Sequence, residues 1–75
     1  MRIYLELYEI VTVESTAEPD FIRIDVTEWS KYDIDTAIQL LIKHAQQSYT
    51  SYIIQMHYCR HDENQLCTVT IIDTR

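Results

Sequence analysis

Residues 33–48, DIDTAIQLLIKHAQQS, repeat their apolar residues with the period of an amphipathic helix. At about 100° per residue, one side of this helix is apolar and the opposite side is polar. The apolar side consists of Ile34, Ala37, Ile38, Leu41, Ile42 and Ala45. Ser30 or Asp33 can serve as the N-cap residue, so the start of the helix is well specified. A helix of this kind needs an apolar layer to pack on, and the rest of the chain must supply it.

Two stretches before the helix alternate apolar and polar residues, which is the pattern of a half-buried strand. The first covers residues 3–13, where an adjacent apolar pair at Ile10 and Val11 suggests a bulge near Glu9. Residues 14–19, ESTAEP, form the connection, and Pro19 marks its end. Residues 21–29 then give the second strand of a hairpin.

Two further strands follow the helix, at residues 49–60 and 66–74. A turn centred on Glu63 would pair Cys59 with Cys67 and allow a disulfide, whereas an even-length turn pairs Tyr58 with Cys67. The second register is preferred because its inward pairs are apolar. These pairs are Met56 with Val69 and Ile54 with Ile71. It leaves both cysteines reduced, one of them buried beside the core.

The element order is therefore β-β-α-β-β, and the fold class is α+β. Residues 1–75 form a single domain, a four-stranded antiparallel sheet with one helix packed on one face. A helix that runs back across the sheet favours the strand order 2-1-3-4. The order 1-2-4-3 remains open.

The net charge of −6 lies entirely in the first half of the chain. Residues 1–35 hold nine acidic and three basic residues, while residues 36–75 hold three of each. An acidic field repels nucleic acid and favours basic partners, although the same acids also keep a small domain soluble. The nine candidate partner-binding acids are Glu6, Glu9, Glu14, Glu18, Asp20, Asp25, Glu28, Asp33 and Asp35.

One helix covers only one face of a four-stranded sheet, so the far face is left with apolar and aromatic side chains. Such a patch is typical of a partner surface, and a homodimer is the commonest way to cover it. Alternatively, the residues are scattered and shielded by their polar neighbours. The candidate dimer face consists of Tyr4, Tyr8, Phe21, Ile53 and Ile72.

No motif indicates catalysis, a metal or a cofactor. His57 and His61 on one strand would lie about 13 Å apart, too far to close one zinc site. The chain has no glycine for a phosphate-binding loop, and its aromatic residues lack the basic groove that direct nucleic acid binding needs. We therefore expect no enzyme, no metal and no direct nucleic acid binding. Neither a membrane span nor a signal peptide is expected, which favours a cytoplasmic location.

A short acidic chain that runs from a strand hairpin through WSKYDIDTAIQLLIKHA to a second hairpin resembles the small phage-encoded inhibitors, among them the anti-CRISPR proteins. The resemblance covers the whole length but lies in the architecture alone, so it assigns no functional residue. It implies a viral protein that acts in the host cytoplasm as a nucleic acid mimic and inhibits a host complex stoichiometrically.

The expected function is thus that of a small acidic inhibitor that occupies a basic, nucleic-acid-binding surface of a host protein or nucleoprotein complex. The alternative is a structural or assembly module that homodimerises through the exposed sheet face.

Overall fold

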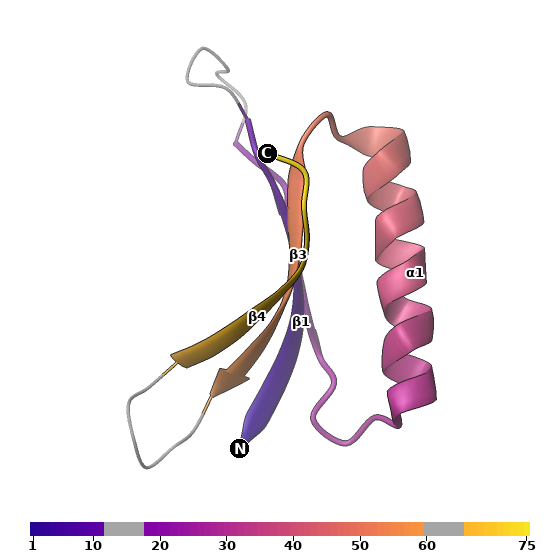
Figure 1. The fold of residues 1–75 in the computed structure, drawn as a ribbon, viewed down its shortest axis with the longest axis vertical. Helices are drawn as coiled ribbons and strands as arrows, with labels where there is room; N and C mark the ends of the chain where they lie inside the picture. Colours follow the sequence, from indigo (N-terminus) through magenta and orange to yellow (C-terminus); the bar gives the residue numbers. More distant parts are fainter. Residues whose placement is uncertain (12–17, 60–65) are drawn as a thin grey trace.

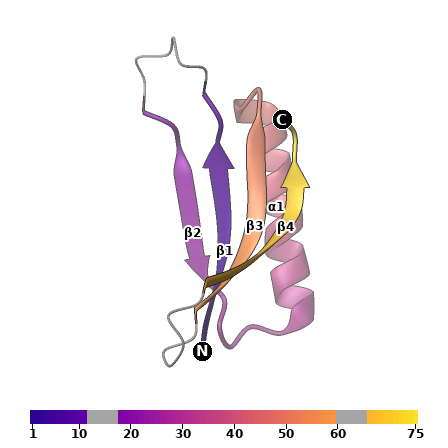
Figure 2. The same ribbon diagram turned by 60° about the vertical axis from the view of Figure 1, so that its left-hand side comes forward.

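A computed structural model describes residues 1–11, 18–59 and 66–75. Its elements are β1 (Arg2–Glu9), β2 (Phe21–Asp25), α1 (Lys31–Ser48), β3 (Tyr52–Cys59) and β4 (Leu66–Asp73). The strands form one antiparallel sheet in the order β2-β1-β3-β4 (Figure 2). The α+β class and the strand order 2-1-3-4 are confirmed. Figure 1 shows α1 along one face of the sheet, and among the described residues no helix lies along the other.

The register between β3 and β4 is partly as expected. Met56 lies opposite Val69, and Tyr58 lies opposite Cys67, so the two cysteines point to opposite faces of the sheet and both are free. The pairing shifts between Ile54 and Gln55, and Ile54 lies opposite Ile72, where Ile71 was expected. A bulge in β4 produces this shift because one extra residue enters that strand.

The prediction of a bulge near Glu9 is wrong. The pairing of β1 with β3 runs without a shift from Arg2 to Glu9, and the Ile10 amide continues it by donating to the Ser51 carbonyl at 2.9 Å. Strand β2 ends at Asp25, earlier than expected, because the Asp25 carboxylate accepts a hydrogen bond from the Thr27 amide at 3.0 Å and turns the chain.

Helix α1 begins two residues before the expected start. Ser30 is the N-cap, and its hydroxyl accepts a hydrogen bond from the Asp33 amide at 3.1 Å. At the other end, the Tyr49 amide donates to the Ala45 carbonyl at 2.8 Å. The helix packs over the two central strands, β1 and β3. The two edge strands, β2 and β4, therefore extend beyond it.

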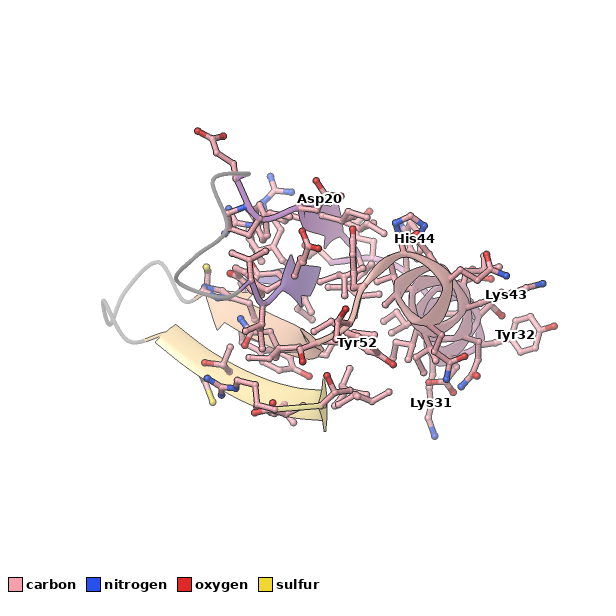
Figure 3. The ribbon with its side chains drawn as sticks, turned by 90° about the horizontal axis from the view of Figure 1, so that it is seen from above. Asp20, Lys31, Tyr32, Lys43, His44 and Tyr52 are labelled. Atoms are coloured by element: carbon pink, nitrogen blue, oxygen red, sulfur yellow. The ribbon has the colours of Figure 1, made fainter. Side chains whose placement is uncertain are left out.

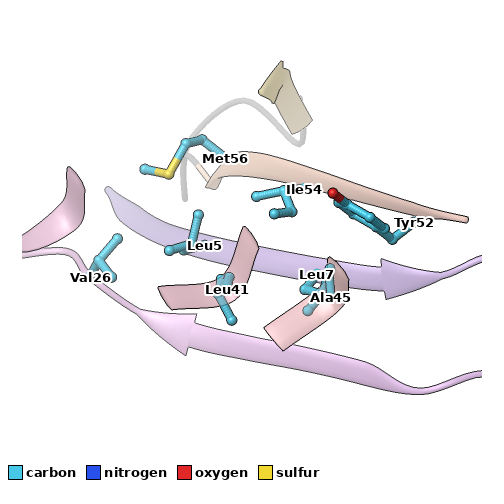
Figure 4. Packing of buried hydrophobic residues seen from close by; sticks show 8 residues of the cluster. All are labelled: Leu5, Leu7, Val26, Leu41, Ala45, Tyr52, Ile54 and Met56. Carbon is cyan, nitrogen blue, oxygen red and sulfur yellow. The ribbon is translucent and has the colours of Figure 1, made fainter. Parts of the chain in front are cut away.

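The core lies between α1 and these central strands (Figure 4). Leu41 and Ala45 are the buried residues of the helix. The sheet and the chain after β2 complete the core with Leu5, Leu7, Val26, Tyr52, Ile54 and Met56. Val69 was expected to face the core but is 51% exposed, because the first half of β4 curves away from α1 (Figure 1).

Candidate functional site

The open face of the sheet carries a buried carboxylate. Glu6 lies in the middle of β1 and has no exposed surface. Its neighbours across the sheet are Arg23 on β2 and Gln55 on β3. Arg23 Nε and one terminal guanidinium nitrogen each lie 2.8 Å from Glu6 Oε2, and Gln55 Nε2 donates to Glu6 Oε1 at 2.9 Å. His57 Nδ1 lies 3.4 Å from Oε1 and forms an ion pair only when the imidazole is protonated.

Aromatic side chains surround this polar cluster. The Arg23 guanidinium lies 5.2 Å from the ring centre of Tyr4 and 5.3 Å from that of Phe21, which are cation–π distances. The rings of Tyr8 and Phe21 lie 4.7 Å apart. These rings and Arg23 lie on the sheet face opposite α1, where Glu6 has no exposed surface.

The electrostatics of the cluster favour the ionised carboxylate. Burial opposes the ionisation of Glu6, but hydrogen bonds from Gln55 and Arg23, with the charge of Arg23, outweigh it and hold the pKa of Glu6 below its ordinary value. Burial and the charge of Glu6 raise the pKa of Tyr8. Glu6 is thus a satisfied acceptor that fixes three strands to one another, which is a structural role.

This geometry corrects one of the proposed partner-binding acids. Glu6 is among them as one of the nine acids in residues 1–35, but a fully buried and paired carboxylate cannot present its charge to a partner. The signal that identifies it is the pairing of β1 with both neighbours, which puts Arg23 and Gln55 directly across from Glu6. That pairing becomes visible only once the register is known.

The other described acids gather near the two ends of β2. Close to its start, Glu18 and Asp20 are exposed, and half-buried Glu9 accepts a hydrogen bond from the Asp20 amide at 3.0 Å. We call these three the upper acids. Glu14 lies outside the described residues.

The lower acids follow the end of β2 and continue into the first turns of α1. All four are exposed, and they are Asp25, Glu28, Asp33 and Asp35. Asp25 forms an ion pair with Arg2 at 3.0 Å. Hydrogen bonds from Thr27, together with Arg2, hold the pKa of Asp25 below its ordinary value. Within the described part of the chain, no ion pair involves Glu28, Asp33 or Asp35.

A polar contact joins the end of α1 to the start of β2. The Tyr49 hydroxyl donates to Asp20 Oδ2 at 3.2 Å and lies 3.3 Å from His44 Nε2. Burial and the bond to Asp20 raise the pKa of Tyr49. Figure 3 shows Asp20 and His44 on the same side of the molecule, whereas Tyr32 and Lys43 project from the helix away from the sheet.

Between α1 and β2 the surface forms an open apolar groove of about 480 Å³. Its lining consists of Ile24, Trp29, Asp33, Thr36, Ala37, Leu40 and Leu41. Leu40 is 64% exposed and Trp29 is 44% exposed. The groove exists because α1 packs over β1 and β3 and leaves the inner side of β2 uncovered. The sequence patterns did not predict this groove. Its only signal was that two large apolar residues, Leu40 and Trp29, belonged neither to the predicted apolar side of the helix nor to the candidate dimer face.

Only four of the five residues of the candidate dimer face lie on the same face of the sheet. Phe21 is 48% exposed, while Tyr4, Tyr8 and Ile53 on the same face are half-buried. Ile72 is wrongly placed in this set. Because of the bulge in β4 it lies opposite Ile54 and packs against the core, on the helix side of the sheet.

Other kinds of site are not apparent in the described residues. Within residues 1–11, 18–59 and 66–75, no three His, Cys, Asp or Glu side chains converge as metal ligands. His61 lies outside these ranges. No helix in the described part of the chain is long and apolar enough to cross a membrane. No family model, curated protein or solved structure matches the chain.

Proposed function

We propose that this chain is a small protein-binding inhibitor that uses its exposed acids to occupy a basic, nucleic-acid-binding surface of a larger complex. The observation that carries the proposal is the exposure of every acid between Glu18 and Asp35, in a segment with only two basic residues, Arg23 and Lys31. Arg23 is itself committed to buried Glu6. The flank of the molecule formed by β2 and its adjoining turns is therefore strongly negative.

The spacing of the acids defines the partner surface. The upper and lower acids lie at opposite ends of β2, and from Asp20 to Asp25 the chain rises about 17 Å at the spacing of a strand. This exceeds the Debye length of about 8 Å at physiological salt, so the two groups act on separate parts of the partner. We infer a partner with two basic patches separated by a similar distance, as along a groove that binds a nucleic acid backbone. The resemblance to anti-CRISPR proteins favours a CRISPR effector complex as such a partner.

Affinity capture from a lysate of the native host, with mass spectrometry, tests this function. The wild-type chain should recover a basic nucleic-acid-binding protein that added DNA or RNA displaces and that high salt releases. Two variants with the same net charge provide the comparison. The first neutralises three exposed acids, Glu18→Gln, Glu28→Gln and Asp35→Asn. The second adds three lysines elsewhere, Gln39→Lys, Gln46→Lys and Thr70→Lys.

The acid-neutralised variant should lose the partner, and the lysine variant should retain most of it. Equal recovery by both variants would show that only net charge matters. Recovery that is unchanged by salt and by all three neutralisations would contradict the proposal.

A second candidate function is self-association through the open sheet face, and it is favoured by the 48% exposure of Phe21. It is weaker than the first because Tyr4 and Tyr8 already enclose the Glu6 cluster and Ile72 lies on the other face. Two copies would also bring together two net charges of −6, which oppose association.

A further inference from the structure

We propose that the edge of β2 that no described strand pairs, with the apolar groove beside it, forms a docking site for an extended, basic partner segment, which adds to the sheet as a fifth strand. This inference rests on the proposed function, since it names the part of the molecule that such a partner engages. The segment places alternate apolar side chains in the groove and carries lysine or arginine among its other residues.

The backbone of β2 offers the hydrogen bonds for this addition. The Glu9 amide donates to the Asp20 carbonyl and the Val26 amide donates to the Ile3 carbonyl, both at 2.9 Å. Because the hydrogen bonds of an antiparallel pair recur at alternate residues, the amides and carbonyls of Ile22 and Ile24 also point to β1. Those of the intervening Phe21, Arg23 and Asp25 therefore point away from the sheet, at the edge that β2 forms in the described strand order.

The groove determines which side chains the added strand carries. Partner residues opposite Ile22 and Ile24 face the same side of the sheet as these isoleucines, which is the side of α1. There the residue opposite Ile24 meets Leu40 and Ala37 of the helix and the ring of Trp29, whereas Ile22 lies outside the groove lining. Medium-sized apolar side chains at alternate positions fill this space and bury Leu40, which is otherwise 64% exposed.

The acids around the groove favour a cationic segment and argue against a second copy of this chain. Asp33 lies in the groove lining, and Glu28 lines the adjoining pocket on the other side of Trp29, together with the ion pair of Arg2 and Asp25. A cationic segment gains from these acids, whereas a second copy brings a net charge of −6. Antiparallel pairing of two copies of β2 centred on Arg23 would also place two arginines directly across from each other, which is unfavourable.

The single tryptophan of the chain, Trp29, reports on the groove because its ring lines it. The probe is the palindromic peptide Lys-Leu-Thr-Leu-Lys, acetylated and amidated, which presents the same pattern in either strand direction. One leucine enters the groove opposite Ile24 and the other lies opposite Ile22. The threonine lies beside Arg23, and the lysines lie beside Phe21 and Asp25. Saturable binding, with a blue shift of the Trp29 emission, is expected at peptide concentrations up to about 1 mM.

Matched controls separate strand addition from simple attraction. In antiparallel addition, N-methylation of the threonine removes an amide that faces β2 and should abolish the shift, whereas N-methylation of one leucine removes an amide that faces away and should preserve it. In parallel addition the two results are exchanged. Replacing both lysines by glutamates should abolish binding. Leu40→Glu should weaken binding at least about tenfold, while Gln39→Glu, which adds the same charge at an exposed residue outside the groove, should leave it almost unchanged.

The outcomes also separate this inference from the proposed function. No saturable Trp29 response to the peptide, or equal responses to both N-methylated peptides, overturns the docking mode. A Trp29 shift that appears on concentrating the protein without peptide identifies a second copy as the occupant and overturns it as well. If Leu40→Glu still captures the natural partner in a salt-dependent way, the docking mode is wrong and the proposed function stands. If the peptide binds as expected but neutralising the acids leaves partner capture unchanged, the proposed function is wrong and the docking site stands.

Discussion

Glu6 and Arg23 form an ion pair at 2.8 Å on the sheet face that α1 leaves open, and the Glu6 side chain of this pair has no exposed surface. A buried carboxylate is costly unless it is paired and hydrogen-bonded. Arg23 and Gln55 meet this requirement from the two neighbouring strands. The cluster therefore fixes β1 to β2 and β3 by side chains in addition to the backbone ladder.

Replacing Glu6 by glutamine tests this role through the dependence of stability on pH. The folded-state pKa of Glu6 is lowered, so its contribution is present above the unfolded value of about 4.3 and is lost as pH falls through the folded value. At pH 7, Glu6→Gln should lower the free energy of unfolding by about 1–2 kcal/mol. Below pH 5 the difference from wild type should shrink. Denaturant unfolding across this range measures both effects, with exposed Glu28→Gln as the control, and a constant difference at all pH values would refute the assignment.

Sequence patterns predicted the fold wherever apolar residues recur along one whole side of a helix or strand. The apolar period of α1 and the alternation in β1 and β3 define buried sides, and the connections between them restrict the strand order. Local irregularities did not follow from the sequence. The bulge in β4 falls at Ile71, next to Ile72. Because both residues are apolar, the alternation of apolar and polar residues does not show which of them lies opposite Ile54.

The candidate site was harder to predict than the fold, and for a physical reason. The exposed acids could be read from charge alone, but the burial of Glu6 depends on side chains 17 and 49 residues away in the sequence. The groove depends on where α1 lies across the sheet. Helical periodicity identifies the inward side of the helix, but it does not reveal that β2 extends beyond it.

Two adjacent leucines test the placement of α1. Leu41 is 7% exposed and belongs to the core, while Leu40 is 64% exposed and lies at the groove. Leu41→Ala should lower the free energy of unfolding by about 2–4 kcal/mol, because it leaves a cavity. Leu40→Ala should change it by less than about 0.5 kcal/mol. Thermal or denaturant unfolding measures both changes. Similar losses of unfolding free energy at the two positions would mean that the helix is rotated from the orientation described.

The two cysteines test the register of the second hairpin. Cys67 lies opposite Tyr58, so Cys59 and Cys67 face opposite sides of the sheet. Neither is buried, contrary to the expectation of one beside the core, since Cys59 is half-buried and Cys67 is exposed. A thiol reagent should titrate both in the native protein, and Cys67 should react faster. A chain that yields no free thiol until it is reduced would indicate a disulfide and a different register.

The open sheet face gives a separate prediction about oligomeric state. If this face is not an interface, the wild-type chain sediments as a monomer at high concentration, and Phe21→Lys leaves its sedimentation unchanged. Phe21 is a better probe than Tyr8, because Tyr8→Glu would place a second carboxylate beside Glu6 and destabilise the fold. A wild-type dimer that Phe21→Lys dissociates would favour the assembly function.

Binding through the exposed acids that flank β2 is tested most directly by the dissociation constant of the captured partner, measured at low and at physiological salt. The measurement compares the wild type with the acid-neutralised variant and with the lysine variant of equal net charge. We expect the wild type to bind more weakly as salt rises. At low salt, the acid-neutralised variant should bind at least about tenfold more weakly than the lysine variant. Equal affinities for the two variants, or a wild-type affinity that does not depend on salt, would contradict the proposed function.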